Sequence, residues 1–477
     1  MSRRRLRDVL VVLPGITGSV LYRGSIPIWG PSYRLGTAFL ARPARAGARL
    51  ELTALAEDVD DSHAVRATAL MPHAHMVAGL VKIDGYSQLL QKIRDNFEVV
   101  DGNGQTPTNL IEFPYDWRLD NRITARRLAE VVERGLADWR RFADVPDARV
   151  IFIGHSMGGL VARYYLEVLQ GWRNCRALIT FGTPFRGSPL ALGYLANGYK
   201  RLHIDLSAAM RSFPAVYQLL PIYPALSVGG NWRRVAEVPE LPGVDAELAA
   251  DGLRFHREIE SAIAMNDAMQ PNRYAMLPVV GTHQPTFQSA YLSDGRITLS
   301  RALPDGVDAF FGGDTDGDST VPVVSAAPID LSNVYADVYC PERHSALQAG
   351  PAVLSDLIGK IAKMQARHLA KLRGPAPHSV GELTALSLAL DDAYRSDERV
   401  IIEADLSGAD PHGVEMTAEL TELADGRTTT QAMRPTAGRW RLDLNELPAG
   451  AYRIAVTASG GGTLGATPVH DLFEVVP

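Results

Sequence analysis

The sequence predicts an α/β fold followed by a smaller all-β domain, and three observations support this organisation. Over the first 373 residues, short apolar runs alternate with longer segments whose apolar residues recur at helical spacing. Such alternation is typical of a mostly parallel sheet covered by helices on both faces. After residue 373 the period changes to two, and turn signals recur at short intervals, as in an immunoglobulin-like β-sandwich. A length of 477 residues allows two or three domains.

The elements of the first domain can be placed in chain order. Apolar runs predict strands at residues 8–13, 109–113, 149–153, 177–181, 275–281 and 334–338. Helical spacing predicts helices at residues 86–97, 124–142, 159–167 and 348–372. Two stretches interrupt this pattern, a lid insertion at residues 24–85 and a cap insertion at residues 187–273. We expect both above the carboxyl ends of the strands, where open α/β sheets bind ligands.

The second domain begins after a short rigid linker, Gly-Pro-Ala-Pro at residues 374–377. We therefore expect an α/β domain at residues 1–373 and a β-sandwich at residues 378–477. Strands of the sandwich are expected at residues 400–404, 414–420, 440–444 and 452–456. The sandwich could be an interaction or regulatory module that binds a protein partner; a spacer or a second lid are the alternatives.

Composition favours an ordinary globular protein, with 46% hydrophobic and 21% charged residues and a net charge of −6. Nothing in this balance indicates a nucleic-acid partner. A basic cluster at residues 3–7 is either a solvated tail or the start of a signal peptide, but the apolar run after it ends at once in Pro14. Cys175 and Cys340 indicate neither a disulfide framework nor a metal site, although one disulfide between them is an alternative. The predicted location is the cytoplasm, with peripheral association with membranes.

The most informative motif is Gly-His-Ser-Met-Gly at residues 154–158, between a predicted strand and a predicted helix. Small residues at both ends allow a sharp turn that exposes the Ser156 hydroxyl at the top of a sheet. The following helix directs its positive N-terminal end at the same point, where an oxyanion would form. The sequence therefore predicts a nucleophilic serine in an α/β-hydrolase fold.

A serine nucleophile needs a base and an acid, which on this plan follow in the order Ser, Asp or Glu, His. The acid candidates are three aspartates between residues 313 and 322, and the histidine candidate is His344. The same aspartates resemble the start of a calcium loop, but Ser319 and Ser325 stand where an EF-hand needs Gly and Glu. A solvated acidic turn is the third alternative.

Other positions complete the candidate site. Oxyanion donors are expected to be the backbone N–H groups of Met157 and of Ile16 in a Pro-Gly-Ile-Thr-Gly loop. His155 is expected to be only the variable position of the turn. His73 and His75 could be a metal pair, although a surface loop is the simpler interpretation; no metal or cofactor is predicted. The apolar stretch at residues 213–226 could contact a membrane or form the internal face of the cap.

Seven motifs in order resemble the lecithin:cholesterol acyltransferase-like family, which includes acyltransferases and phospholipases A. They are Pro-Gly-Ile-Thr-Gly-Ser (14–19) with Trp29, Tyr-Asp-Trp-Arg (115–118), Gly-His-Ser-Met-Gly-Gly (154–159), Thr-Pro-Phe-Arg-Gly-Ser (183–188), Leu-Leu-Pro (219–221), Gly-Asp-Ser-Thr-Val-Pro (317–322) and His344. The resemblance covers residues 8–370 and implies that Ser156 is the nucleophile, Asp318 the acid and His344 the base. It also suggests substrate contacts at Trp29, Phe185, Leu219 and Leu220, and a structural role for Tyr-Asp-Trp-Arg. The sequence lacks a cysteine pair in the lid, and the sandwich lies outside the family's domain.

The resulting hypothesis is a serine-dependent lipid acyl hydrolase or O-acyltransferase that acts through an acyl-Ser156 intermediate on a lipid ester at a membrane surface. Whether water or an alcohol accepts the acyl group depends on how well the cap excludes water. A non-lipid esterase or amidase is the alternative within enzymes. An inactive hydrolase fold that binds lipid or serves as a scaffold is the alternative outside them.

Overall fold

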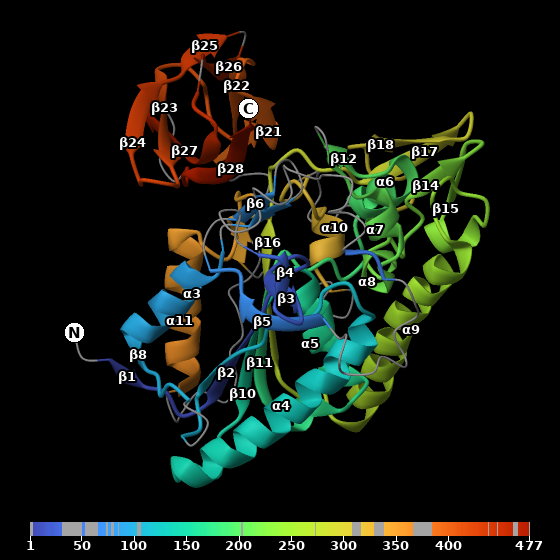
Figure 1. The fold of residues 1–477 in the computed structure, drawn as a ribbon, viewed down its shortest axis with the longest axis vertical. Helices are drawn as coiled ribbons and strands as arrows, with labels where there is room; N and C mark the ends of the chain where they lie inside the picture. The colour runs from blue at the N-terminus through green and yellow to red at the C-terminus, as the bar shows by residue number, and fades with distance from the viewer. Residues whose placement is uncertain are drawn as a thin grey trace.

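The structure, a computed structural model, has an α/β domain and a β-sandwich (Figure 1). It describes residues 3–30, 50–52, 65–72, 75–77, 81–83, 85–102, 106–201, 204–271, 273–307, 316–328, 338–365, 384–436, 438–445, 447–460 and 466–476. The predicted linker at residues 374–377 and the candidate His73 lie outside these ranges. Among the described residues, no helix is long and apolar enough to cross a membrane.

The central sheet of the first domain is parallel throughout, as the alternation of strands and helices predicts. Its order is β19-β16-β11-β10-β2-β9. The strands are β2 (Val9–Leu13), β9 (Leu110–Glu112), β10 (Val150–His155), β11 (Cys175–Phe181), β16 (Ala275–Gly281) and β19 (Val338–Cys340). Strand β2 lies between β9 and β10, so the direction of winding reverses there and the loops after β2 and β10 diverge. Ligands bind at such a switch point. The α/β-hydrolase fold class is confirmed.

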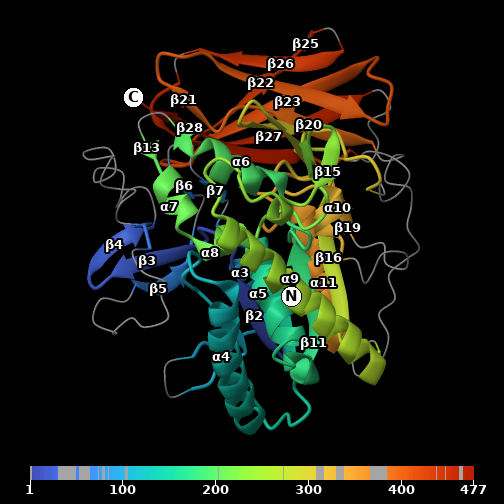
Figure 2. The same cartoon turned by 90° about the vertical axis from the view of Figure 1, so that its right-hand side faces the viewer.

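Helices cover both faces of this sheet (Figures 1 and 2). Helices α3 (Ser87–Asn96) and α11 (Pro351–Gln365) pack together on one face, and α4 (Asn121–Phe142), α5 (Met157–Glu167) and α9 (Ala246–Met269) on the other. Helix α4 begins three residues before the expected position because the Asp120 carboxylate caps it by accepting from Arg122 N. The closing helix begins at Pro351 and not at residue 348, since proline suits the first helical turn. Residues 366–372 of that prediction lie outside the described ranges, as do residues 334–337 of the last strand.

The cap is larger than the predicted insertion. Its mixed sheet has the order β15-β14-β17-β18 and joins residues that precede β16 in the sequence to residues that follow β16. The elements are α6 (Pro189–Asn197), β12 (Lys200–Arg201), β13 (Ile204–Asp205), α7 (Ser207–Arg211), α8 (Pro214–Tyr217), β14 (Leu226–Val228), β15 (Asn231–Arg233), η2 (Val235–Glu237), β17 (Ser289–Ser293) and β18 (Arg296–Ser300). The long-range pairing of β14 with β17 brings residues 289–300 into the cap, which local periodicity could not indicate.

Smaller elements occupy the lid region and the connections. Strands β4 and β5 of the lid pair with β3, which precedes the lid, in the sheet β4-β3-β5, and the lid also contains the hairpin β6-β7. These strands are β3 (Ser19–Arg23), β4 (Ile26–Trp29), β5 (Val65–Leu70), β6 (His75–Val77) and β7 (Val81–Ile83). The remaining elements are β1 (Arg4–Arg5), β8 (Phe97–Glu98), η1 (Gly171–Asn174) and α10 (Val323–Ala326). Strand pairing by β1 shows that part of the basic N-terminal cluster is an exposed edge strand.

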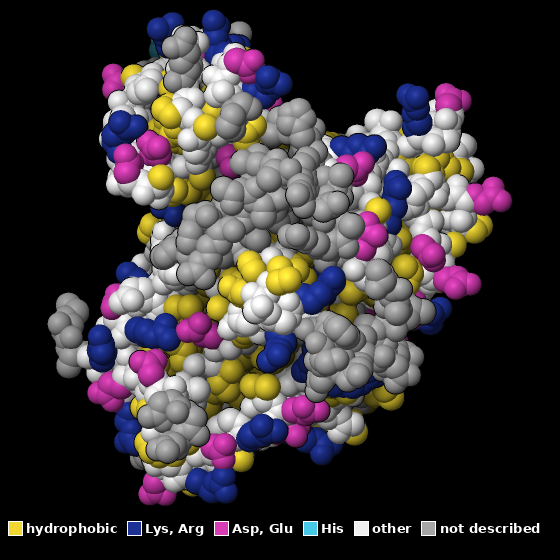
Figure 3. Space-filling model, in the orientation of Figure 1, with side chains coloured by type: hydrophobic (Ala, Val, Ile, Leu, Met, Phe, Trp, Pro, Cys, Tyr) yellow, Lys and Arg dark blue, Asp and Glu magenta, His cyan; other side chains and the backbone are white. Residues whose placement is uncertain are grey.

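The C-terminal domain consists of two sheets with a hydrophobic core of its own, as the period of two predicts. Their orders are β20-β22-β26-β25 and β21-β28-β27-β23-β24. The strands are β20 (Ala385–Ala389), β21 (Ala393–Arg395), β22 (Val400–Ser407), β23 (Val414–Glu422), β24 (Thr428–Ala432), β25 (Arg434–Thr436), β26 (Arg439–Leu444), β27 (Gly450–Gly460) and β28 (Val469–Val476). Figure 3 shows positive and negative side chains interspersed over the visible face of this domain, as on a solvated surface.

Candidate active site

Ser156 lies in a sharp turn between β10 and α5. Its φ of 51° and ψ of −125° are unusual for a residue with a side chain, as expected of a strained turn that presents a nucleophile. The lack of a side chain at Gly158 allows the turn to pack closely, because a Cβ added there would lie 2.5 Å from Pro14 O and 2.7 Å from Leu13 O. The N-terminus of α5 is therefore pressed against the loop that follows β2.

The structure brings His344 and Asp318 to Ser156, although they lie far apart in the sequence. His344 Nε2 is 2.9 Å from Ser156 Oγ, and His344 Nδ1 is 2.7 Å from Asp318 Oδ2. The carboxylate of Asp318 is fully buried, and its Oδ1 accepts from the backbone N–H groups of Thr320 and Val321. Since a carboxylate only accepts, Nδ1 of His344 carries the proton and Nε2 is free to accept from the serine hydroxyl.

The loop after β2 lies against the same serine. A Cβ at Gly15 would lie 2.9 Å from Ser156 Cβ, and Ile16 and Thr17 line the cavity in front of the hydroxyl. Met157 opens α5, so its N–H belongs to the helix N-terminus beside Ser156. The two expected oxyanion donors, Ile16 and Met157, are thus on the two segments that flank Ser156.

A buried hydrogen-bond chain, which the sequence did not reveal, connects the loop after β2, the turn that carries Ser156 and the loop that carries His344. Gly15 N donates to the hydroxyl of Tyr86 (2.8 Å), which donates to Nδ1 of His155 (2.9 Å). Nε2 of His155 then donates to the backbone carbonyl of His344 (3.2 Å). Burial first, and the nearby His344 second, lower the pKa of His155 to about 3, so the ring stays neutral. His155 is therefore more than the variable position of the turn.

The Tyr-Asp-Trp-Arg segment supports the loop after β2, in agreement with the structural role that the resemblance implies. The Tyr115 hydroxyl donates to Pro14 O (2.7 Å), and the Trp117 indole N–H donates to Ser19 O (3.3 Å). The buried guanidinium of Arg118 makes two hydrogen bonds to Asp116, at 2.8 and 2.7 Å. Such a paired, fully bonded charge is tolerated in the interior and fixes the segment.

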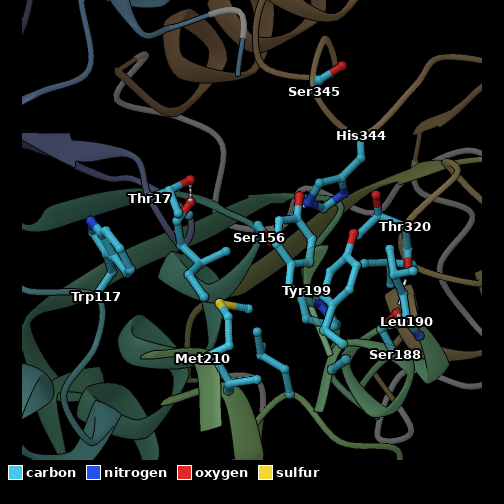
Figure 4. A pocket seen from close by; sticks show the side chains of 18 of the residues that line it. Thr17, Trp117, Ser156, Ser188, Leu190, Tyr199, Met210, Thr320, His344 and Ser345 are labelled. Carbon is cyan, nitrogen blue, oxygen red and sulfur yellow. Dashed lines mark hydrogen bonds between the residues drawn. The ribbon is translucent and has the colours of Figure 1, made fainter. Parts of the chain in front are cut away.

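A cavity of about 220 Å³ opens at Ser156 and His344. Figure 4 shows both side chains beside it, with Leu190, Tyr199 and Met210 along its walls. Most of the cap residues that line it are apolar: Leu190, Ala191, Tyr194, Tyr199, Leu206, Met210, Phe213, Val216 and Leu219. Residues Phe213, Val216 and Leu226 are buried, so the apolar stretch at 213–226 forms the internal face of the cap.

Two of the four residues predicted to contact substrate line the cavity, and the contact itself stays a prediction. Trp29 and Leu219 line the cavity, and the Trp29 indole also donates to Thr17 O (2.8 Å). Phe185 and Leu220 are not among its lining residues. Leu220 is buried in the core, and a Cβ at Gly187 would lie 2.1 Å from its carbonyl oxygen. Adjacent positions in the motif therefore face in different directions, which the motif alone cannot show.

The structure also bears on the other interpretations of the acidic loop and of the two cysteines. The Asp318 carboxylate is taken up by His344 and two backbone N–H groups, and Asp316 Oδ1 accepts from Thr286 N (3.3 Å). No group of three or more His, Cys, Asp or Glu side chains in the described part of the chain is arranged to hold a metal ion. Cys175 and Cys340 are both buried and free, so the alternative of a disulfide between them was wrong.

The chain matches one family model, described as lecithin:cholesterol acyltransferase, over residues 75–267. The resemblance is thereby confirmed over a shorter range than the expected residues 8–370. The matched range contains Ser156 and most of the cap and ends before Asp318 and His344. No curated protein sequence matches the chain.

Matches among solved structures include the Bacillus licheniformis lipase BlEst2. Its propeptide form has 13% identity and a TM-score of 0.33 over 98% of this chain and 92% of that chain. Its mature form has 12% identity and a TM-score of 0.33 over 74% and 91%. A PKD domain of an M14-like peptidase from a Thermoplasmatales archaeon covers 20% of this chain and 100% of that chain, with 13% identity and a TM-score of 0.15.

Proposed function

We propose that this protein is a serine-dependent lipid acyl hydrolase or O-acyltransferase that acts through an acyl-Ser156 intermediate. The observation that carries the proposal is the hydrogen-bonded series Ser156–His344–Asp318 at the opening of an apolar cavity. The match to the lecithin:cholesterol acyltransferase family supports it independently.

In the proposed reaction, Ser156 Oγ attacks the ester carbonyl carbon while its proton passes to His344 Nε2. Asp318 holds the imidazole in the required tautomer and stabilises the imidazolium. The N–H groups of Ile16 and Met157 donate to the oxyanion, each contributing on the order of 3 kcal/mol in the transition state. Collapse breaks the ester bond, the departing alkoxide takes the proton from His344, and the acyl group stays on Ser156.

The apolar cap walls favour an acyl chain as the group bound next to the serine, because burying each CH₂ stabilises binding by about 0.8 kcal/mol. In the second half of the reaction, His344 takes a proton from water or from an alcohol, whose oxygen attacks the acyl-enzyme. Water yields a fatty acid and an alcohol yields a new ester. The proposal includes a substrate drawn from a lipid surface, and cytoplasmic location stays a prediction from composition.

The first test is Ser156→Ala against esters of increasing acyl length, with wild type as reference. We expect kcat to fall by about 10⁴-fold or more, since the oxyanion donors alone leave only residual catalysis. A fluorophosphonate probe should label the wild type and not the variant. Undiminished turnover by the pure variant, or a wild type that neither turns over any ester nor reacts with the probe, would contradict the proposal and favour a lipid-binding scaffold.

The choice of substrate and acceptor needs two further comparisons. A preference for long acyl chains over short soluble esters in kcat/KM supports the lipid enzyme, whereas the reverse preference supports a non-lipid esterase. Product analysis with and without a long-chain alcohol then separates the two lipid reactions. A new ester that forms at the expense of fatty acid identifies the transferase.

A further inference from the structure

The C-terminal sandwich contacts the α/β domain at the loop that carries His344. The sandwich lies above the carboxyl ends of the central strands (Figure 1). Its edge strand β20 and the start of β28 hydrogen-bond to Glu342, Arg343 and Ser345 and to Gln284. The described part of the sandwich therefore meets the same short loop on which the proposed base is located.

The first contact holds the residue two positions before His344. Glu342 is buried, with 3% of its surface exposed, and its Oε1 accepts from His470 N (2.9 Å). Its Oε2 is 2.8 Å from Nδ1 of the same histidine. A carboxylate removed from water to this degree needs such partners, so the contact is specific and not a chance surface encounter.

The second contact holds both neighbours of His344. Asp471 is 1% exposed, and its Oδ2 is 2.9 Å from Arg343 Nε. Its Oδ1 accepts from the hydroxyl of Ser345 at 3.3 Å. Arg343 extends this contact by donating from Nη1 to Leu388 O on β20 (2.8 Å). One carboxylate of the sandwich thus bonds the side chains on either side of the imidazole.

The third contact ties the sandwich edge to the acid loop. Gln284 is fully buried; its Nε2 donates to Leu386 O (2.9 Å) and its Oε1 accepts from Leu388 N (3.1 Å). Its backbone N–H donates to Gly317 O (2.9 Å), next to Asp318. The free edge of β20 is therefore paired by side chains of the other domain, as an edge strand requires when it is covered.

We propose that the sandwich is a structural part of the active site and that Asp471 is a positioning residue that holds the His344 loop through Arg343 and Ser345. This inference rests on the proposed function. A base must stay within about 0.5 Å of its productive position to accept the serine proton, and side chains on a loop need support to do so. Asp392 and Asp471 also line the cavity beside Ser156, so the sandwich forms part of its wall.

A sandwich that holds the His344 loop and a sandwich that only covers the cavity would respond differently when its contacts are weakened. If the domain only blocked the cavity, weakening its contacts would admit substrate and raise activity. If it holds the loop, weakening the same contacts loosens His344 and lowers kcat. KM then changes less, because the apolar cap residues form a larger part of the described lining than the sandwich, which contributes Asp392 and Asp471. The sign of the change in kcat therefore decides between the two roles.

The test is Asp471→Asn in the full chain, which leaves the shape and removes the charge that pairs with Arg343. We expect kcat to fall about tenfold and KM to change less than about twofold, since a small displacement of a catalytic group is enough for such a loss. The matched control is Asp443→Asn on β26, which makes the same change in an exposed pair with Arg441 of the same domain. The control should keep wild-type kcat.

A second variant covers the case in which Asp471→Asn does not fold. Arg343→Lys keeps the positive charge but cannot bond Asp471 and Leu388 O together, and we expect a loss of about threefold to fivefold. The double variant should be no slower than the slower single variant, because both act on one contact. Losses that multiply would show that Asp471 does not act through Arg343.

Amide hydrogen exchange at residues 342–347 gives a measurement that does not depend on turnover. It should speed up in Asp471→Asn and stay at the wild-type rate in Asp443→Asn. Unchanged exchange in this segment, or a kcat equal to or above that of wild type, overturns the positioning role. If the wild type is active and Asp471→Asn has the same kcat, this inference fails and the proposed function stands. If the wild type has no esterase activity, the proposed function fails, and hydrogen exchange still tests the contact.

Discussion

The two halves of the candidate site are held in place by different kinds of contact. Ser156 is fixed by backbone geometry: a positive φ, a helix that starts at the next residue, and glycines at positions 15 and 158 that allow close approach. His344 is fixed by side chains from distant parts of the chain, which include Asp318 at a separation of 26 residues and the sandwich at separations of 126–128.

This difference teaches which parts of a serine site a local motif can encode. A strained turn is specified by five residues, and substitutions there act through sterics on the backbone. A loop held by buried ionic and polar contacts is specified by its partners, so it can be displaced by changes more than 100 residues away. The following variants test whether the half that carries Ser156 (the nucleophile half) and the half that carries His344 (the base half) respond in these two ways.

Among variants that keep Ser156, Asp318 and His344, the largest effect is expected from Gly158→Ala in the nucleophile half. The new Cβ would stand 2.5 Å from Pro14 O and 2.7 Å from Leu13 O, closer than real contacts allow, so α5 and the loop after β2 must separate. That separation moves the N–H groups of Ile16 and Met157 from the position proposed for the oxyanion. We expect kcat to fall about 10²-fold and the free energy of unfolding to fall by about 1–3 kcal/mol, measured by ester turnover and urea denaturation.

The matched control is Gly359→Ala in helix α11, where an added Cβ meets nothing within 4 Å. Here alanine should raise stability by about 0.5–1 kcal/mol and leave kcat unchanged. If Gly158→Ala keeps wild-type kcat, the nucleophile half does not depend on this close approach, and the contrast between the two halves fails.

A smaller effect is expected from Tyr86→Phe, which breaks the chain that links the halves. Loss of the hydroxyl leaves Gly15 N and His155 Nδ1 without this partner in a buried position. We expect about 1–3 kcal/mol less stability, and a fall in kcat of about tenfold because both the oxyanion loop and the His344 carbonyl lose support.

Tyr452→Phe in the sandwich provides the comparison for this loss. Tyr452 is a buried residue whose hydroxyl donates to Pro448 O (2.8 Å), so the same atom is removed far from Ser156. This variant should lose stability and keep kcat. Equal kcat in Tyr86→Phe and Tyr452→Phe would mean that the chain through His155 only stabilises the fold.

The sequence predicted the nucleophile half well because its information is local. The strand, turn and helix around Ser156 end within two residues of their expected positions, and the order of acid and histidine pointed to Asp318 and His344. The sequence missed Tyr86, His155 and Asp471, whose roles depend on partners at separations of 69, 71, 126 and 189 residues. It also could not show that Phe185 and Leu220 lie outside the lining of the cavity, because neighbours in a motif need not face the same cavity.

The smallest effect is the dependence of stability on pH, which should have opposite signs in the two domains. Burial lowers the pKa of His155 to about 3 and of His256 to about 4, below the value near 6.5 of an unfolded chain. Between these values the unfolded chain binds more protons, so the first domain loses stability as the pH falls below 6.5. Burial raises the pKa of Glu474 in β28 to about 7 from 4.5. There the folded chain binds more protons, so the sandwich loses stability as the pH rises from 4.5 through 7.

Two single variants separate these slopes, each at most about 1.4 kcal/mol per pH unit for one group. His256→Gln retains a donor toward Gln218 O, the partner of His256 Nε2, and should weaken the loss toward acid. Glu474→Gln should stabilise the protein at pH 8 relative to wild type and have little effect at pH 5, because the buried carboxyl is then already neutral. Urea denaturation of wild type and both variants at pH 5, 6, 7 and 8 measures the slopes. If the free energy of unfolding changes with pH in the same way for Glu474→Gln and wild type, Glu474 does not give the sandwich a pH dependence of opposite sign. The expected contrast in pH dependence between the α/β domain and the sandwich then fails.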